Sequence, residues 1–198
     1  MRINKLILGF SALFAALSIV PALPAQDFNH GEVGAFADYF RLGQTGNNFV
    51  GIGGRAGVNV TSFVQFEAEM SYDFNQVFTE GFQNTSGGTA TFASSNMRVL
   101  HGLFGPKIQT KGPVKFFLTA KGGFVNFRFD PVPASFGTFT SSVDNLRTTN
   151  VSAAFYPGGG FEAYLGPVGL RLDVGDEMYF AGGTHHNLRI SFGPQIRF

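Results

Sequence analysis

The segment SFVQFEAEMSYDF, residues 62–74, switches between apolar and polar side chains at nearly every step. One parity carries Val64, Phe66, Ala68, Met70, Tyr72 and Phe74, and the other carries Gln65, Glu67, Glu69, Ser71 and Asp73. Successive side chains of a β-strand point to opposite faces of its sheet. The segment therefore predicts a strand with one apolar face and one face rich in charge.

The same alternation recurs down the chain. It predicts eight strands, at residues 32–42, 48–60, 64–74, 97–109, 114–124, 151–165, 168–177 and 187–198. Every second connection is short, at residues 61–63, 110–113 and 166–167, whereas the longest connections, 75–96 and 130–148, are rich in Gly, Ser and Thr. In an up-and-down antiparallel sheet, the short turns then lie at one end and the long loops at the other. This asymmetry is typical of outer-membrane barrels.

The first 25 residues differ from the rest. Arg2 and Lys5 precede an apolar stretch over residues 6–20, and a Pro/Ala-rich stretch ends at Ala25. This layout is typical of a secretory signal peptide, so we expect residues 1–25 to be cleaved and residues 26–198 to form one domain. The alternative is an uncleaved membrane anchor, although a spanning helix needs about 20 apolar residues.

The composition of the remaining chain excludes several classes of protein. Without Arg2 and Lys5, 12 basic residues stand against 13 acidic ones, a balance that gives no electrostatic footprint for nucleic acid. There is no cysteine, so we expect neither disulfides nor a lipid-modified N-terminal cysteine. No segment after residue 25 is apolar over the length of a spanning helix. A closed barrel is therefore the one way for this domain to cross a membrane.

The polar faces combine glycine with charges of both signs, which suits a narrow, filled interior. The apolar faces run about 9–11 residues, enough for a tilted strand to cross a bilayer. Aromatic residues gather where the girdles of a membrane barrel would lie: Tyr39, Phe40, Tyr72, Phe74, Phe124, Tyr179 and Phe180 near the loops, and Phe63, Phe104, Tyr164, Phe192 and Phe198 near the turns. We therefore predict an all-β fold, an eight-stranded antiparallel up-and-down transmembrane β-barrel.

A secreted, soluble, lipocalin-like barrel that binds a small apolar ligand is the alternative fold. Such a barrel would bury Phe66 and Leu170 and expose Glu67 and Arg171 to water. A membrane barrel places these four side chains the other way round.

The last segment, NLRISFGPQIRF, is an amphipathic strand that ends on Phe198. It resembles the C-terminal assembly signal of outer-membrane proteins, which implies that the barrel assembly machinery reads Ile190, Phe192, Ile196 and Phe198. The mature chain as a whole resembles the small OmpA/OmpX-like barrels of Gram-negative bacteria. The resemblance implies location in the outer membrane and contact with its lipid. It does not extend to the peptidoglycan-binding domain of OmpA, so a role in tethering the cell wall is not implied.

Charged residues on the polar faces are expected to meet inside the barrel. The predicted lumen network consists of Asp38, Arg55, Glu67, Glu69, Lys121, Glu162, Arg171, Asp173 and Arg189, and His101, Lys107 and Lys115 share their faces. If Gly166 and Pro167 centre one turn, Glu162 lies opposite Arg171, and a three-residue turn at 61–63 places Arg55 opposite Glu69. We therefore expect Arg171→Ala to cost more stability than Arg189→Ala.

Eight strands close around an interior just wide enough for side chains to fill. The network is therefore expected to plug the barrel, with a narrow gated ion path as the alternative.

Three prolines lie inside predicted strands. Pro106, Pro157 and Pro194 each remove a hydrogen-bond donor, so we expect bulges, with a slip of parity at Pro157. Two of them belong to a weak repeat, LHGLFGPKIQ (residues 100–109) and LRISFGPQIR (residues 188–197). The repeat indicates either duplication of a four-stranded half or similar demands at the turn end of the barrel.

The stretch GGTHHNLRIS, residues 182–191, is the best candidate for catalytic residues. His186 and Ser191 are five positions apart, so a strand directs them to opposite faces, and Asn187 stands where a His-x-Ser lipid A deacylase pattern needs serine. His185 and His186 are adjacent and cannot face one metal from a strand. We expect no catalysis, no cofactor and no metal, with a lipid-modifying outer-membrane barrel enzyme as the alternative.

The expected function is structural or adhesive at the cell surface. Binding residues concentrate on loops held by a rigid scaffold. The loops at 75–96 and 130–148 are therefore the candidates for contact with a surface ligand.

Overall fold

The computed structural model describes residues 29–84, 90–130, 139–141 and 151–198. The predicted signal peptide, residues 1–25, lies outside this part of the chain. Within it, no helix is long and apolar enough to span a membrane.

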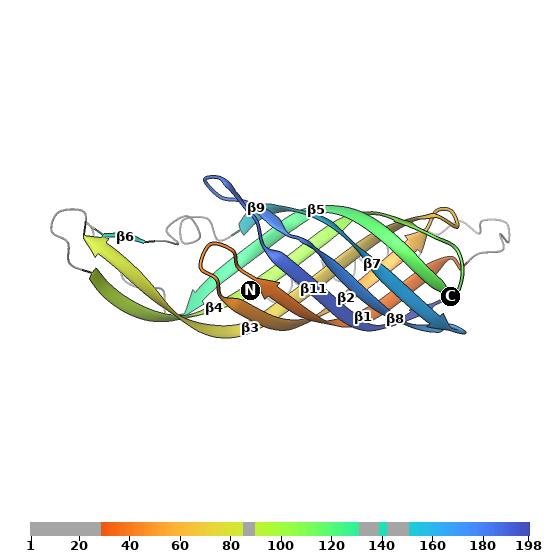
Figure 1. Ribbon diagram of the computed structural model, residues 1–198, viewed down its shortest axis with the longest axis horizontal. Helices are drawn as coiled ribbons and strands as arrows, with labels where there is room; N and C mark the ends of the chain where they lie inside the picture. Colours follow the sequence, from red (N-terminus) through yellow and green to blue (C-terminus); the bar gives the residue numbers. More distant parts are fainter. Residues whose placement is uncertain (1–28, 85–89, 131–138, 142–150) are drawn as a thin grey trace, which may run out of the picture.

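The described residues form one antiparallel sheet of β-strands (Figure 1). In chain order these are β1 (Gly31–Arg41), β2 (Asn48–Asn59), β3 (Val64–Asn84), β4 (Ala90–Gln109), β5 (Val114–Asp130), β6 (Phe139–Ser141), β7 (Val151–Leu165), β8 (Val168–Asp176), β9 (Met178–Phe180), β10 (Thr184–His185) and β11 (Leu188–Arg197).

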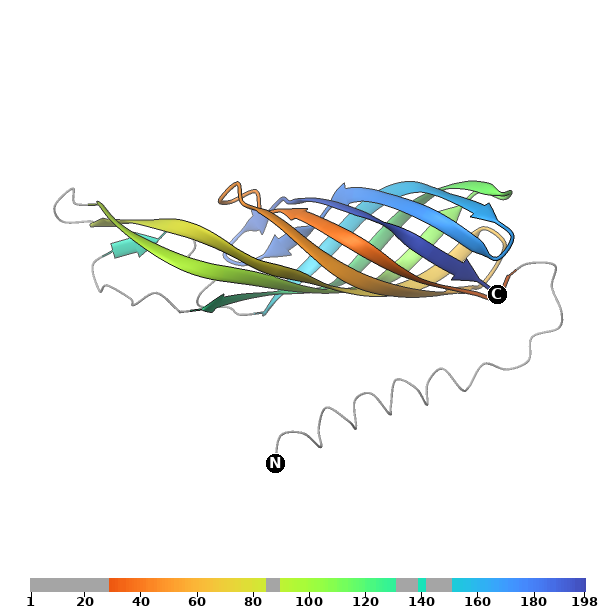
Figure 2. The same ribbon diagram turned by 90° about the horizontal axis from the view of Figure 1, so that it is seen from below.

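The sheet closes on itself. Each strand from β1 to β5 pairs with the next, β5 pairs with β7, β7 with β8, β8 with β11, and β11 returns to β1. The short β9 continues the line of β8 along β7, so the wall has eight strands. The predicted fold, an eight-stranded antiparallel up-and-down barrel, is confirmed. Figure 2 shows the C-terminus at the end of the barrel with the short turns, opposite the end from which β3 and β4 project.

The predicted register of two hairpins is also confirmed. Glu162 pairs with Arg171 across the turn at Gly166, whose φ of +64° is a conformation that glycine adopts without strain. Arg55 pairs with Glu69 across the turn between β2 and β3.

The expected bulge and parity slip at Pro157 are wrong. The register of β7 against β5 runs unbroken through Pro157, and even-numbered residues face inward on both sides of it. The ladder between β7 and the strand that follows it pauses instead, because β8 ends at Asp176 and β9 begins at Met178. The strand thus accommodates the missing donor by a gap in hydrogen bonding and keeps its register.

The two Gly-Pro pairs of the sequence repeat interrupt the hydrogen-bond ladder in the same way in two strands, β4 and β11. The ladder from β4 to β5 skips Gly105 and Pro106, and the ladder from β11 to β1 skips Gly193 and Pro194, without a shift of register in either. At each glycine the neighbouring strand comes very close. A Cβ on Gly105 would lie 2.2 Å from the Ala120 carbonyl oxygen, and one on Gly193 would lie 2.0 Å from that of Ala35. The shared local geometry accounts for the shared sequence.

The expectation of a loop at residues 75–96 is wrong for most of that range. After a register shift between Asp73 and Gln76, β3 continues to Asn84 and pairs with β4 as far as Ala90. Beyond the barrel these strands form a two-stranded extension, the β3–β4 ribbon (residues 76–84 and 90–96), which projects past the other strands in Figure 1. The short β6 pairs with its tip. Of the predicted loop 130–148, residues 131–138 and 142–148 lie outside the described residues.

The outer surface of the barrel wall is apolar. Phe66, Leu118, Leu170 and Phe192 are 43%, 72%, 51% and 52% exposed. Glu67 and Arg171, their alternating neighbours, are only 2% exposed. This reversal of the usual distribution is the one that a bilayer requires of a transmembrane barrel, and it excludes the soluble lipocalin-like alternative.

Three aromatic residues assigned to the outer girdles point inward instead. Phe40 and Tyr179 are fully buried near the loop end, and Tyr164 is buried near the turn end. Phe40 and Tyr164 share their parity with Asp38 and Glu162 of their own strands, and Tyr179 shares that of the lumen charges of β8, whose line β9 continues. Parity, not aromatic character, therefore decides the face.

We predict that Gly193→Ala weakens the closure of the barrel, because the new Cβ would collide with the Ala35 carbonyl oxygen of β1. The free energy of unfolding should fall by about 1–3 kcal/mol, as for overpacking elsewhere. Urea titration of the refolded barrel in detergent measures it. Gly122→Ala is the control, because a Cβ at Gly122 has no atom within 4 Å. Equal midpoints for the two variants would contradict the steric account.

Candidate functional site: the charged lumen

Every one of the eight wall strands places a charged side chain in the lumen. The nine residues of the predicted network all lie there, together with Glu32, Asp73, His101, Lys107, Lys115 and Glu177. Eight carboxylates thus face six Lys and Arg side chains and one histidine. Sequence reasoning did not assign Glu32 to the lumen, although its parity with Asp38 on β1 marks the same face.

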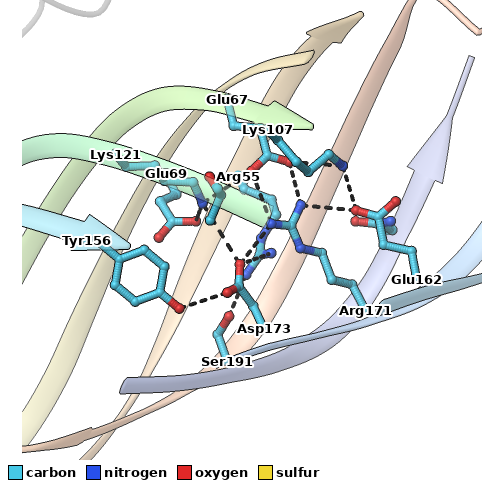
Figure 3. Close-up of polar contacts among 12 residues, drawn as sticks. Arg55, Glu67, Glu69, Lys107, Lys121, Tyr156, Glu162, Arg171, Asp173 and Ser191 are labelled. Atoms are coloured by element: carbon cyan, nitrogen blue, oxygen red, sulfur yellow. Dashed lines mark hydrogen bonds and ion pairs between the residues drawn. The ribbon is translucent and has the colours of Figure 1, made fainter. Parts of the chain in front are cut away.

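Arg171 is the centre of the network (Figure 3). Its Nη1 donates to Glu67 and, at 3.2 Å, to Glu162, and its Nη2 donates to Asp173 at 2.8 Å and to Glu67 at 3.0 Å. The guanidinium also lies 4.1 Å from the ring centroid of Phe117. The predicted pair with Glu162 is therefore present, but it is one of three carboxylate contacts.

Two lysines, Lys107 of β4 and Lys121 of β5, bind the same carboxylates. Lys107 Nζ lies 2.6 Å from Glu162, 3.2 Å from Glu67 and 3.2 Å from Glu32. Lys121 Nζ lies 2.7 Å from Glu69 and 3.1 Å from Glu67. Because every carboxylate here has more than one cationic partner, the charges form a continuous network across the lumen.

Arg55 does not use its cross-strand neighbour Glu69. Its Nη2 donates to Ser191 at 2.7 Å, its Nη1 lies 3.7 Å from Asp173, and its guanidinium lies 4.3 Å from the ring centroid of Phe36. The register placed it correctly, but the long side chain reaches across the narrow lumen to other strands.

Arg189 is held as tightly as Arg171. It donates to both oxygens of Asp38 at 2.9–3.0 Å and to Glu69 at 2.9 Å, and it lies 3.2 Å from Glu177. It also donates to Ser71 at 3.0 Å. The structure gives no reason to rank Arg171 above Arg189 in stability, contrary to the expectation from one cross-strand pair.

Above Arg189, the network ends at His101. Its Nδ1 lies 2.6 Å from Glu177 and its Nε2 lies 3.1 Å from Asp73. Asp38, Asp73 and His101 are close enough together to share one metal ion. Both Asp38 oxygens accept hydrogen bonds from Arg189, and both His101 nitrogens contact carboxylates. We therefore assign this cluster to the ion-pair network and not to a metal site.

An apolar plug closes the lumen between this histidine and the loop end. It consists of Phe40, Leu42, Phe49, Met97, Val99, Val125, Phe127 and Tyr179, all fully buried. Phe40 packs its edge against His101 at a centroid distance of 4.8 Å, and Phe127 packs against Tyr179 at 5.0 Å. At the turn end the lumen opens instead into a polar hollow of about 220 Å³ that Asn59, Gln109 and Lys115 help to line.

The candidate catalytic residues are not brought together. Ser191 faces the lumen, where it accepts the hydrogen bond from Arg55. His186 is exposed and its Nδ1 lies 2.5 Å from Asp176. His185 stacks on Tyr179.

The four residues of the predicted assembly signal lie on the outer face of β11 or directly after it. Phe192, Ile196 and Phe198 are at least half exposed, and Ile190 is partly exposed. The backbone of Phe198 closes the barrel, because its carbonyl accepts hydrogen bonds from His30 and Gly31 and its N–H donates to Gly31.

Comparisons with known proteins support the fold. No protein-family model and no curated protein matches the chain by sequence. Among solved structures, Neisserial surface protein A (NspA) is similar with a TM-score of 0.52 and 12% identity over 85% of this chain and 96% of that chain. The N-terminal β-barrel domain of Pseudomonas aeruginosa OprF gives 0.51 and 11% over 87% and 100%. This chain has the fold of a small outer-membrane barrel.

The attachment invasion locus protein Ail of Yersinia pestis is also similar, with a TM-score of 0.49 and 12% identity over 86% of this chain and 97% of that chain. At these identities the likeness concerns the fold alone.

We predict that Arg171→Ala and Arg189→Ala each lower the free energy of unfolding by about 3–5 kcal/mol, because each leaves buried carboxylates without a partner. Arg197→Ala is the control, since its guanidinium lies at the exposed rim, where it donates to the Gly166 carbonyl and lies 4.3 Å from the ring centroid of Tyr164 but forms no ion pair with a carboxylate of the described residues. It should change stability by less than about 1 kcal/mol. Urea midpoints in detergent measure all three. A loss at Arg197 as large as at the lumen arginines would contradict the account.

Proposed function

We propose that this chain is a non-catalytic barrel of the outer membrane of a Gram-negative bacterium, with a structural and surface-interaction role. The observation that carries the proposal is the reversed distribution of side chains. Apolar residues cover the outside of the wall, and a paired charge network fills the inside.

The filled lumen favours a structural role over ion transport. A ring of charges selects ions only where water and ions can pass it. Here charges of opposite walls contact one another, as Arg171 of β8 does with Glu67 of β3, and the apolar plug lies between them and the loop end. Both features obstruct an ion path along the axis.

The placement of the polar side chains favours a role without catalysis. A lipid-modifying enzyme needs a nucleophile within hydrogen-bond reach of its base. His186 has Asp176 as a partner, but in the described part of the chain no hydroxyl group hydrogen-bonds to His186. Ser191 lies on the other side of the wall, inside the lumen.

The β3–β4 ribbon is the part of the structure best placed to meet an external partner. It extends beyond the barrel at the end opposite the short turns, and the rigid wall holds its base. Rigidly supported projecting segments are where binding residues concentrate. NspA, which shares the fold, is named a surface protein.

The barrel wall predicts how the protein behaves in a membrane. The membrane fraction should contain a band that migrates differently in SDS-PAGE when boiled and unboiled, because a closed barrel resists unfolding by detergent until it is heated. In planar bilayers the same protein should give no discrete conductance steps. A soluble, unshifted protein would overturn the membrane location, and regular ion-selective steps would overturn the sealed lumen.

We further propose that the outward residues Ile190, Phe192, Ile196 and Phe198 are the signal that the barrel assembly machinery recognises. Phe198→Ala keeps the backbone hydrogen bonds to His30 and Gly31 and removes only the ring, which is 65% exposed. We predict that it reduces the amount of heat-shifting barrel in cells severalfold while refolding in detergent is nearly unchanged.

The matched control is Phe116→Ala, since Phe116 is also 65% exposed and lies near the turn end of β5. An equal loss in both variants would show a general need for outward aromatic residues, and the assembly signal would be abandoned.

A further inference from the structure

Two arginines stand directly opposite each other on the outer face of the wall. Arg98 of β4 is the register partner of Arg128 of β5, and both lie on the outward parity of their strands. Among the cross-strand partners of the described strands, this is the one pair of like charges. Like charges directly opposite each other destabilise a sheet, so the pair is unexplained by the fold.

No described carboxylate forms an ion pair with either guanidinium. The acidic side chains near this end of the barrel, Asp73 and Glu177, point into the lumen and are bonded to His101. Asp176 lies on the outer face of β8 and pairs with His186. The next outward position on β5 after Arg128 is Asp130, whose side chain lies outside the described part.

The height of the pair on the wall is informative. Below it, the outward residues of β5 are Val114, Phe116, Leu118, Ala120, Gly122 and Phe124, and then Asn126 and Arg128 follow. A strand that rises about 3.3 Å per residue and tilts by about 40° climbs roughly 25 Å from Val114 to Phe124, the height of the apolar band of such barrels. Arg98 and Arg128 therefore lie just above the apolar band, at the level of the lipid headgroups on the loop side.

The surface over β3, β4 and β5 is hollowed at this point. A groove of about 270 Å³ is lined by Tyr72, Arg98, Val99, Leu100, Asn126 and Arg128. It combines two guanidinium groups with an amide and a phenol, all donors of hydrogen bonds. Guanidinium groups match the oxygens of a phosphate in pairs, and such charge-assisted bonds are among the strong ones.

We propose that Arg98 and Arg128 bind a phosphate group of a lipid in the outer leaflet. A lipid is favoured over a free phosphate ion because the apolar band begins directly below the groove, with Leu100 and Phe124, so that acyl chains attached to the phosphate would lie along it. A bound phosphate neutralises the two opposed charges and explains why the wall tolerates them. The proposal rests on the membrane location proposed above.

The test compares lipid binding by native mass spectrometry of the refolded barrel in detergent. The probes are diphosphorylated lipid A, the same lipid without its phosphates, and inorganic phosphate. We expect the barrel to hold the diphosphorylated lipid at least about tenfold more tightly than the dephosphorylated one, and the double variant Arg98→Gln, Arg128→Gln to lose this preference. Arg41→Gln is the matched control, because Arg41 is outward and exposed at the loop end of β1 but pairs only with Asn48 and Leu188.

Three outcomes would overturn the proposal. They are an unchanged lipid preference in the double variant, an equal loss in Arg41→Gln, and displacement of the lipid by millimolar inorganic phosphate, which would identify a free-anion site.

Folding is checked separately by the heat shift in SDS-PAGE. In lipid-free detergent the double variant should be at least as stable as the unsubstituted protein, because a repulsion is removed; a clear loss of stability would show that the arginines serve the fold. Failure of the unsubstituted protein to enter membranes would refute the membrane location and not the binding of phosphate.

Discussion

Closure of the sheet between β1 and β11 is the constraint on which the rest of the structure depends. A bilayer offers no partners to backbone N–H and C=O groups, so a sheet that crosses it can have no free edge. Here the first and last wall strands pair, and the backbone of Phe198 extends the pairing to the rim. Once the sheet is closed, the alternation of each strand divides its side chains into a set that faces lipid and a set that faces the lumen.

The narrow lumen of eight strands then determines what the charged set can do. Charges taken out of water cost free energy unless they are paired and hydrogen-bonded. The network meets this cost with multiple contacts, as at Arg171 with three carboxylates and Arg189 with three others. Since the partners come from different strands, the same contacts brace the wall from inside. The narrow lumen of eight strands thus accounts both for the filled interior and for the obstruction of an ion path through it.

The sequence predicts the parity of this barrel well, because one rule of alternation governs every wall strand. Turn lengths then fix the register, which is why the pairing of Glu162 with Arg171 could be predicted. How far a long side chain reaches could not be predicted from the register. Arg55, for example, contacts Asp173 and Ser191 across the lumen instead of its neighbour Glu69. Aromatic residues such as Phe40 suit both an outer girdle and an inner plug. Their aromatic character therefore suggested the wrong face, whereas the parity of the strand gives the correct one.

The β3–β4 ribbon was missed for a different reason. Its sequence has no sustained alternation of apolar and polar residues, and the Gly/Ser/Thr-rich stretch at 85–89 favours a loop, although the backbone continues as strand to Asn84 and again from Ala90. The prolines were misjudged because each strand keeps its register by omitting hydrogen bonds locally, as at Gly193 and Pro194, where the close approach of Ala35 requires glycine.

The central claim is that the apolar face of the wall meets lipid. Because the chain has no cysteine, single spin labels can be placed on β5 at Leu118, Thr119 and Arg128 and examined in bilayers by electron paramagnetic resonance. The account predicts that the label at the outward Leu118 is accessible to oxygen and shielded from a water-soluble nickel complex, that the label at the inward Thr119 is shielded from both, and that the label at Arg128 is accessible to nickel. A label at Leu118 as accessible to nickel as the one at Arg128 would contradict it.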